Sequence, residues 1–206
     1  MTTPELILSE KTSAPELTLS EALLQDIESN CCDKDLSDVS ENSASEMVRH
    51  ILGTFHKRER GFIKEINSYL TEMKNDLPND HDSELWLIRW RDFVKCHLDH
   101  FNEEEKVVFA DLLKVEKPLE EGKNPQAMHM GTLSRPFWDL ENEHQDAIHN
   151  LRSLKKALQH RLPEFPSLQN LSNALENFYS SIIEHIHYET FVLYPAVLKL
   201  EATLCH

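Results

Sequence analysis

Apolar residues recur at intervals of three and four along four long stretches of this chain. The first of these stripes contains Val48, Leu52, Ile63, Ile66 and Leu70. Side chains with this spacing lie on one face of an α-helix. The stripes therefore predict four helices, with approximate limits at residues 44–76, 83–116, 135–162 and 168–202.

Residues at the ends of the stripes set these limits. Ser43 and Glu46 have the spacing of a capping box, in which a hydroxyl and a carboxylate accept hydrogen bonds from free N–H groups. Asp82 or Ser83 is expected to cap the second helix. Residues 117–135 contain two prolines and two glycines, and are expected to form the one long loop.

The order of helices and turns predicts an all-α fold. Short turns join the helices within each half of the chain, and the long loop separates the halves. This arrangement is typical of an antiparallel four-helix bundle built from two αα-hairpins. We expect the bundle to occupy residues 44–202, after an acidic, flexible or loosely helical arm at residues 1–43. Residues 203–206 are expected to be a tail.

The second and fourth helices repeat one pattern. A His is followed four residues later by a Glu, and five residues after that by an aromatic residue. The two copies lie 85 residues apart and begin at His100 and His185, with Glu104 and Glu189 as their carboxylates. Because positions i and i+4 lie on the same side of a helix, each copy presents an imidazole beside a carboxylate.

All four helices place polar residues on faces that should be apolar. The six candidates are imidazoles and carboxylates, namely His56, His100, Glu104, His144, His185 and Glu189. Burial of an unpaired carboxylate costs several kcal/mol, so these groups must pair, contact water or bind metal. Imidazole and carboxylate without thiolate suit iron, manganese or zinc, and two carboxylates able to bridge favour a two-metal centre. A buried His–Glu hydrogen-bond network is the alternative.

Other polar residues fit this centre less well. A ferritin-like site would use Glu-x-x-His, which occurs at 141–144 and 184–187, but Glu184 and His187 lie off the apolar face. His97 is expected to pack beside the centre, and Glu103 and Glu105 to face solvent. His81 would be a ligand if the turn between the first two helices folds inward. The four cysteines lack metal-ligand or disulfide-framework spacing, and Cys96 is expected to lie in the core.

The charge balance limits the range of partners. The chain has 36 acidic and 21 basic residues, a formal net charge of -15. Such a surface repels phosphate groups, so we expect neither nucleic acid nor an anionic membrane as a partner. The sequence has no apolar run after a basic N-terminal segment, and no stretch of about 20 apolar residues that could span a bilayer. A cytoplasmic protein is therefore expected.

These motifs resemble the haemerythrin-like His-His-Glu cation-binding domain, and most closely its di-iron "repair of iron centres" branch. The matching segments are Phe55-His56, His100–Phe109, Met130-Gly131 with Glu143-His144, and His185–Pro195. Oxygen-carrying haemerythrins have a second His four residues into the third-helix motif, whereas this chain has Ile148. The branch also has Cys-Cys-Gly near its N-terminus, where this chain has Cys31-Cys32 followed by Asp33.

The resemblance implies a non-haem di-iron protein. Glu104 and Glu189 would bridge two iron ions, four histidines would be terminal ligands, and His81 would stand for a further family histidine. The implied role is repair of iron–sulfur clusters damaged by nitrosative or oxidative stress, without the turnover of a conventional enzyme. Expected partners are damaged iron–sulfur proteins and NO or dioxygen, with the chain a monomer or homodimer. A sensor of oxygen, NO or iron, or a metal-free structural bundle, remains an alternative.

Overall fold

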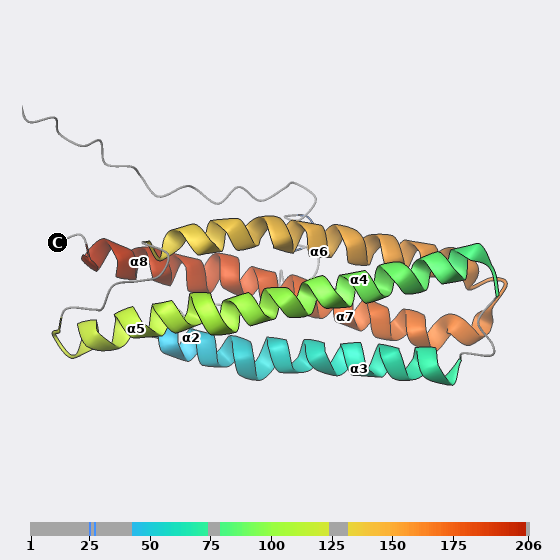
Figure 1. Ribbon diagram of the computed structural model, residues 1–206, viewed down its shortest axis with the longest axis horizontal. Coiled ribbons are helices and arrows are strands. Elements are labelled where there is room, and N and C mark those ends of the chain that lie inside the picture. The colour runs from blue at the N-terminus through green and yellow to red at the C-terminus, as the bar shows by residue number, and fades with distance from the viewer. Residues whose placement is uncertain (1–24, 26, 28–42, 74–78, 124–131, 205–206) are drawn as a thin grey trace, which may run out of the picture.

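The computed structural model describes residues 25, 27, 43–73, 79–123 and 132–204, and these residues form four long helical rods and no strand (Figure 1). The first two rods are α2 (Ala44–His50), η2 (Ile51–His56) and α3 (Lys57–Glu72), then α4 (His81–Glu103), η3 (Glu104–Val108) and α5 (Phe109–Glu120). The others are α6 (Ser134–Arg161), then a 3-10 turn η4 (Pro166–Leu168), α7 (Gln169–Tyr188), η5 (Glu189–Leu193) and α8 (Tyr194–Leu204). Segments η2, η3 and η5 are π-helical.

The rods alternate in direction along the long axis of the molecule (Figure 1). Helix α7 packs along α3 and α6, and α6 also packs along α4. The predicted all-α, antiparallel four-helix bundle is confirmed. None of the described helices is long and apolar enough to cross a lipid bilayer.

The first helix begins where the sequence predicts. The Ser43 Oγ accepts the Glu46 N–H at 3.3 Å, and Glu46 Oε2 accepts the Ser43 N–H at 2.9 Å, which confirms the capping box. Glu116 of α5 adds a cap from another rod, because its carboxylate accepts the N–H groups of Ala44 and Ser45. This buried carboxylate ties the start of the first rod to the end of the second.

Several predicted boundaries were wrong. Asp80, rather than Asp82 or Ser83, caps α4, because the helix already begins at His81 and the Asp80 carboxylate reaches the Ser83 N–H at 2.9 Å. Residues 117–120, predicted as loop, continue α5. Pro118 lies in the last turn, where its missing N–H costs at most one helical hydrogen bond. Residues 203 and 204, predicted as tail, belong to α8.

Two apolar clusters fill the bundle on either side of a polar layer. One cluster is built around Trp90 and Phe178, and the other around Phe109 and Leu193, all of which are at most 1% exposed. Both clusters draw on all four rods, so the rods are held together above and below the polar layer. This polar layer contains six of the predicted candidates, namely His56, His100, Glu104, His144, His185 and Glu189.

Part of the predicted arm lies within the described residues. Gln25 and Ile27 are helical; Gln25 is exposed, whereas Ile27 is 5% exposed and belongs to the cluster around Trp90. The motifs Cys31-Cys32 and Met130-Gly131 lie outside the described residues.

Candidate metal centre

Three of the four rods change from α- to π-helix at the polar layer. Segments η3 and η5 begin at Glu104 and Glu189, and η2 ends at His56. The N–H groups of Phe109 and Tyr194 donate to the carbonyl oxygens of these two glutamates, five residues earlier. A π-helical turn holds one more residue than an α-helical turn, and such turns are frequent at functional sites. We did not predict them, although the repeated five-residue spacing from Glu to an aromatic residue matches these bonds.

Glu104 lies between the imidazoles of four histidines, which come from all four rods. Its Oε2 is 3.1 Å from His56 Nε2, and its Oε1 is 3.1 Å from His100 Nε2. The potential ligand atoms of His56, Glu104 and His185 lie within 4.8 Å of one another, and so do those of His100, Glu104 and His144. One carboxylate therefore serves two groups of three potential metal ligands.

Glu189 occupies the corresponding place on η5. Its Oε1 is 3.3 Å from His185 Nε2, and its Oε2 is 3.2 Å from His144 Nε2. The Nε2 atoms of His100 and His144 are 3.1 Å apart. Each of the two carboxylates thus offers one oxygen to each pair of histidines, as a bridge between two cations requires.

Most of the inward-facing ligand atoms have no hydrogen-bond partner; the exceptions include the Nε2 atoms of His100 and His144, which contact each other. His56 Nε2, His185 Nε2, both oxygens of Glu104 and Oε1 of Glu189 are buried and make no hydrogen bond. Their separations are in the range of ion pairs, but their directions do not fit hydrogen bonds. Buried polar atoms are rarely left unpaired, because each costs about 1–3 kcal/mol. Cations between these lone pairs would satisfy them, so the donor set fits a metal centre better than a self-contained hydrogen-bond network.

An outer set of carboxylates holds the opposite ring nitrogens. His56 Nδ1 is 2.8 Å from Glu105 Oε1, and His100 Nδ1 is 2.8 Å from Glu143 Oε2. A carboxylate at Nδ1 fixes the proton there and leaves the Nε2 lone pair for a metal. The prediction that Glu105 faces solvent was wrong. This residue is half-buried, because its carboxylate contacts His56 and pairs with Arg60 on the first rod.

Glu59 is a residue of the centre that sequence analysis missed. It is fully buried on α3, with Oε1 3.4 Å from His185 Nδ1 and Oε2 2.9 Å from His97 Nε2. The Ser181 hydroxyl also donates to it at 3.2 Å. The spacing could have revealed Glu59, because it follows His56 by three residues and so shares its helical face. His97 is buried beside the centre, as predicted.

The buried charges stabilise one another. Burial alone would lower the pKa of His100, but the Glu104 and Glu143 carboxylates raise it to about 10. Burial alone would raise the pKa of Glu59, but His185 and His97 hold it well below its usual range. Without metal, the neighbouring carboxylates therefore favour the protonated forms of His100, His144 and His185, whose pKa values they raise. Metal binding must displace protons from the imidazoles, so metal affinity is expected to rise with pH.

The structure brings together six of the seven predicted ligands. His81, the seventh, is exposed at the first residue of α4, roughly 28 Å along the helix from His100. Glu184 pairs with Arg58 at 2.8 Å, and among the described residues neither Glu184 nor His187 belongs to a group of three potential metal ligands. The rejection of the ferritin-like arrangement at 184–187 therefore agrees with the structure.

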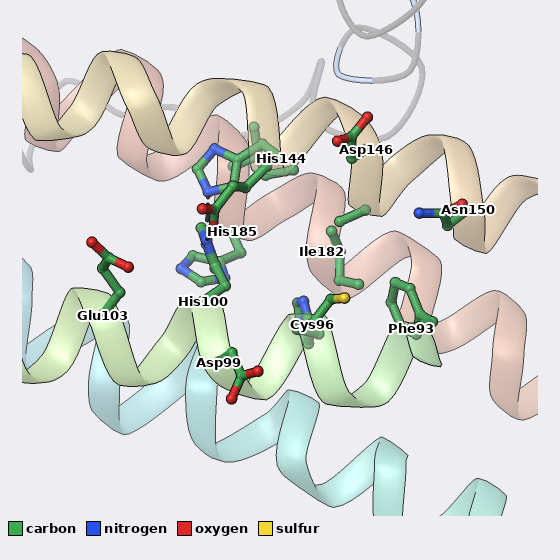
Figure 2. Close-up of a pocket in the computed structure, with 14 residues that line it drawn as sticks. Phe93, Cys96, Asp99, His100, Glu103, His144, Asp146, Asn150, Ile182 and His185 are labelled. Carbon is green, nitrogen blue, oxygen red and sulfur yellow. Dashed lines mark hydrogen bonds and ion pairs between the residues drawn. The ribbon is translucent and has the colours of Figure 1, made fainter. Parts of the chain in front are cut away.

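A pocket of about 360 Å³ connects the polar layer with the surface (Figure 2). Helices α4, α6 and α7 form its walls, and His100, His144 and His185 are among its lining residues. Cys96 lies one helical turn from His100 in the same pocket (Figure 2). The prediction that Cys96 lies in the core was wrong, since it is exposed, and it faces this opening rather than the apolar interior.

Comparisons with known proteins agree with this geometry. The family model described as the hemerythrin HHE cation binding domain matches residues 47–197, which include all six converging residues. A protein of Haemophilus influenzae described as a probable iron-sulfur cluster repair protein is 24% identical over 183 residues. That similarity covers 87% of this chain and 76% of the other protein.

The raised histidine pKa values predict a pH dependence for metal-free protein prepared with a chelator. The His100 contribution to stability is complete below the ordinary pKa of 6.5 and is lost as the pH rises through about 10. The Glu59 contribution is present above its ordinary pKa of 4.5 and is lost as the pH falls. The urea midpoint should therefore be highest between the ordinary pKa values of 4.5 and 6.5, where both contributions are present, and should fall toward alkaline pH. His100→Gln should make this alkaline fall shallower. A midpoint that stays constant from about pH 6 to about pH 10 would contradict this account.

Glu59→Gln tests the outer carboxylate. The amide lacks the charge that balances His97 and His185, so we expect a loss of about 1–3 kcal/mol in unfolding free energy. We also expect metal affinity to fall roughly 10- to 100-fold in a chelator competition. Glu65→Gln is the matched control, because Glu65 is an exposed residue of the same helix. Equal effects of the two substitutions would show that Glu59 has no special role.

Proposed function

The chain belongs to the haemerythrin HHE cation-binding domain family, and on that premise we propose that it is a non-haem di-iron protein that acts in the repair of iron–sulfur clusters. One observation carries the proposal: two groups of three buried ligands share Glu104, and most of their inward-facing atoms make no hydrogen bond. The similarity to a probable iron-sulfur cluster repair protein supports the choice of function.

In this proposal Glu104 and Glu189 would help to hold both ions. His56 and His185 would bind one ion, and His100 and His144 the other. Glu104 and Glu189 would each offer one carboxylate oxygen to the first ion and the other oxygen to the second. Imidazole and carboxylate ligands also suit manganese and zinc, so the preference for iron comes from the similarity to the repair protein.

Iron bound at this centre would supply redox chemistry and an ion that can be given up. The protein supplies the conditions for both. Glu105 and Glu143 hold the Nδ1 protons of His56 and His100, so that the Nε2 lone pairs remain directed inward. Once metal binding had displaced the imidazole protons, the carboxylates would leave the layer with a net negative charge, which favours cations there.

The pocket supports a function that involves exchange with the surroundings. It reaches His100 and His144 past Cys96, Phe93 and Ile182. A diatomic molecule such as NO or dioxygen could enter by this route, and an iron ion could leave by it toward a damaged protein. A purely structural bundle would have no need for an opening at the level of its buried charges.

Metal analysis tests the centre itself. Protein purified from an iron-replete host should contain two iron ions per chain, one for each ligand group. Glu104→Ala should lose both, because this carboxylate belongs to both groups, whereas His81→Ala should lose neither, because His81 is exposed and remote. Iron content by mass spectrometry, with the absorption spectrum, measures the outcome. A wild-type chain without metal, whose stability does not change in His100→Ala, would favour the metal-free structural bundle.

A repair assay tests the function. A dehydratase whose iron–sulfur cluster has been damaged by NO should regain activity when incubated with the iron-loaded protein. The Glu104→Ala variant and an equal amount of free ferrous iron serve as controls, and both should restore much less activity. Equal recovery with free iron would refute a repair role. Binding of NO by the protein without any recovery of the dehydratase would favour a sensor instead.

A further inference from the structure

Helix α7 is buried on a side that does not face the bundle axis. His185 marks the direction of the polar layer. Ile183 precedes it by two residues, so its side chain points about 160° away from that direction, and Tyr179 points about 120° away. Yet Ile183 is 0% exposed and Tyr179 is 6% exposed. Side chains so far from the axis of a four-helix bundle are normally open to water, so another part of the chain must cover them.

Neighbouring α6 accounts for Tyr179. The Lys155 Nζ lies 3.8 Å from the centre of the Tyr179 ring, and Arg152 Nη2 is 3.4 Å from the Tyr179 hydroxyl oxygen. These contacts reach along the α6 side of α7. Ile183 lies farther round the helix, about 40° beyond Tyr179. Its complete burial therefore calls for a further apolar side chain from outside the four rods.

Ile27 has the properties of that side chain. It is 5% exposed and belongs to the same apolar cluster as Ile183 and Ile186. Gln25, two residues earlier on the same helical stretch, is exposed. Residues two apart point to nearly opposite sides of a helix, so one side of this stretch faces the protein and the other faces water.

We propose that the acidic segment before the bundle docks through Ile27 on the outward face of α7, and that this docking braces the turn that carries His185. Opposite charges favour the acidic segment as the part of the chain that covers this face of α7. Residues 1–42 contain ten acidic and two basic side chains, and Arg152 and Lys155 border the face on α6.

The chain is long enough for the segment to dock on its own bundle. The rings of His56 and His185 are 5.0 Å apart, so the α7 face lies at the level of His56. That level is roughly 18 Å along the first rod from Ala44. The 15 residues between Ile27 and Ser43 can span about 50 Å when extended, so a second copy of the chain is not needed.

Docking at this place would be coupled to the centre. Ile183 and Ile186 flank His185 on the same turn of α7, and Glu189 follows one turn later. Whatever fixes this turn from outside also fixes two proposed metal ligands, and metal would in turn strengthen docking, because coupling between two sites is reciprocal. This second part depends on the proposed metal centre, whereas the docking itself does not.

Hydrogen exchange of the full-length chain, prepared without metal, tests the docking. In Ile27→Asp, exchange in residues 179–186 of α7 should rise roughly tenfold or more, because a charged side chain cannot be buried there. Gln25→Asp is the matched control, since it adds the same charge to the exposed side of the same segment. It should exchange like the wild type. Helix content and thermal midpoint show whether the bundle stays folded in both variants.

A variant on the α7 side of the contact tests the docking without any change in the acidic segment. Ile183→Ala should raise exchange around Ile27, and the double variant with Ile27→Asp should add little to either single change. The docking is refuted if Ile27→Asp leaves α7 unchanged, or if Gln25→Asp disturbs it equally. It is also refuted if the effects of the two isoleucine substitutions simply add.

Anaerobic titration with ferrous iron tests the coupling. Ile27→Asp should weaken iron binding by a factor of roughly five or more, and Gln25→Asp should not. Unchanged affinity in Ile27→Asp would refute the coupling while the exchange result still decides the docking. Failure of the wild type to bind iron would overturn the proposed function and the coupling together, again without bearing on the docking.

Discussion

The structure depends on two carboxylates buried among four imidazoles at the middle of the bundle. Glu104 and Glu189 could not stay ionised there without compensation, because the desolvation cost of each is several kcal/mol. In the metal-free chain the carboxylates raise the pKa values of His100, His144 and His185, so positive charge on these three rings compensates them. In our proposal two iron ions would take over this role. The two apolar clusters on either side hold the rods at the separation that this layer needs, so the polar layer and the core specify the same geometry.

The sequence predicted which six imidazoles and carboxylates converge in the polar layer, but not the carboxylates that surround them. The His and Glu pairs at i and i+4 could be read from the chain, because both members lie on one helix and their relative direction is set by the helix itself. Glu143 and Glu59 reach histidines on other rods, so their roles depend on how the rods are rotated against one another. His81 lies far from the layer for another reason, because α4 already begins at this residue, about 19 residues before His100.

The two ring nitrogens of each imidazole have different surroundings. The Nε2 side faces the shared interior, whereas at His56, His100 and His185 the Nδ1 side faces a carboxylate of an outer set. That set connects the centre to the rest of the molecule: Glu105 also pairs with Arg60 at 2.8 Å, and Ser181 links Glu59 to Arg58. Most of the inward-facing atoms can thus remain without hydrogen-bond partners, because contacts at Nδ1 fix the orientation of the rings.

The π-helical turns decide which residues of each rod face inward beyond the polar layer. In an unbroken α-helix Phe109 would point about 180° away from His100, and Leu112 about 120° away. The extra residue in η3 turns the rest of the rod back by about 100°, and both side chains are buried. The directions of the side chains in α5 are therefore set by η3 as well as by α4. Removal of a single residue between Glu104 and Phe109 would leave His100 and Glu104 in place but turn the apolar side chains of α5 away from the core. The number of residues between Glu104 and Phe109 is therefore itself a requirement of the site.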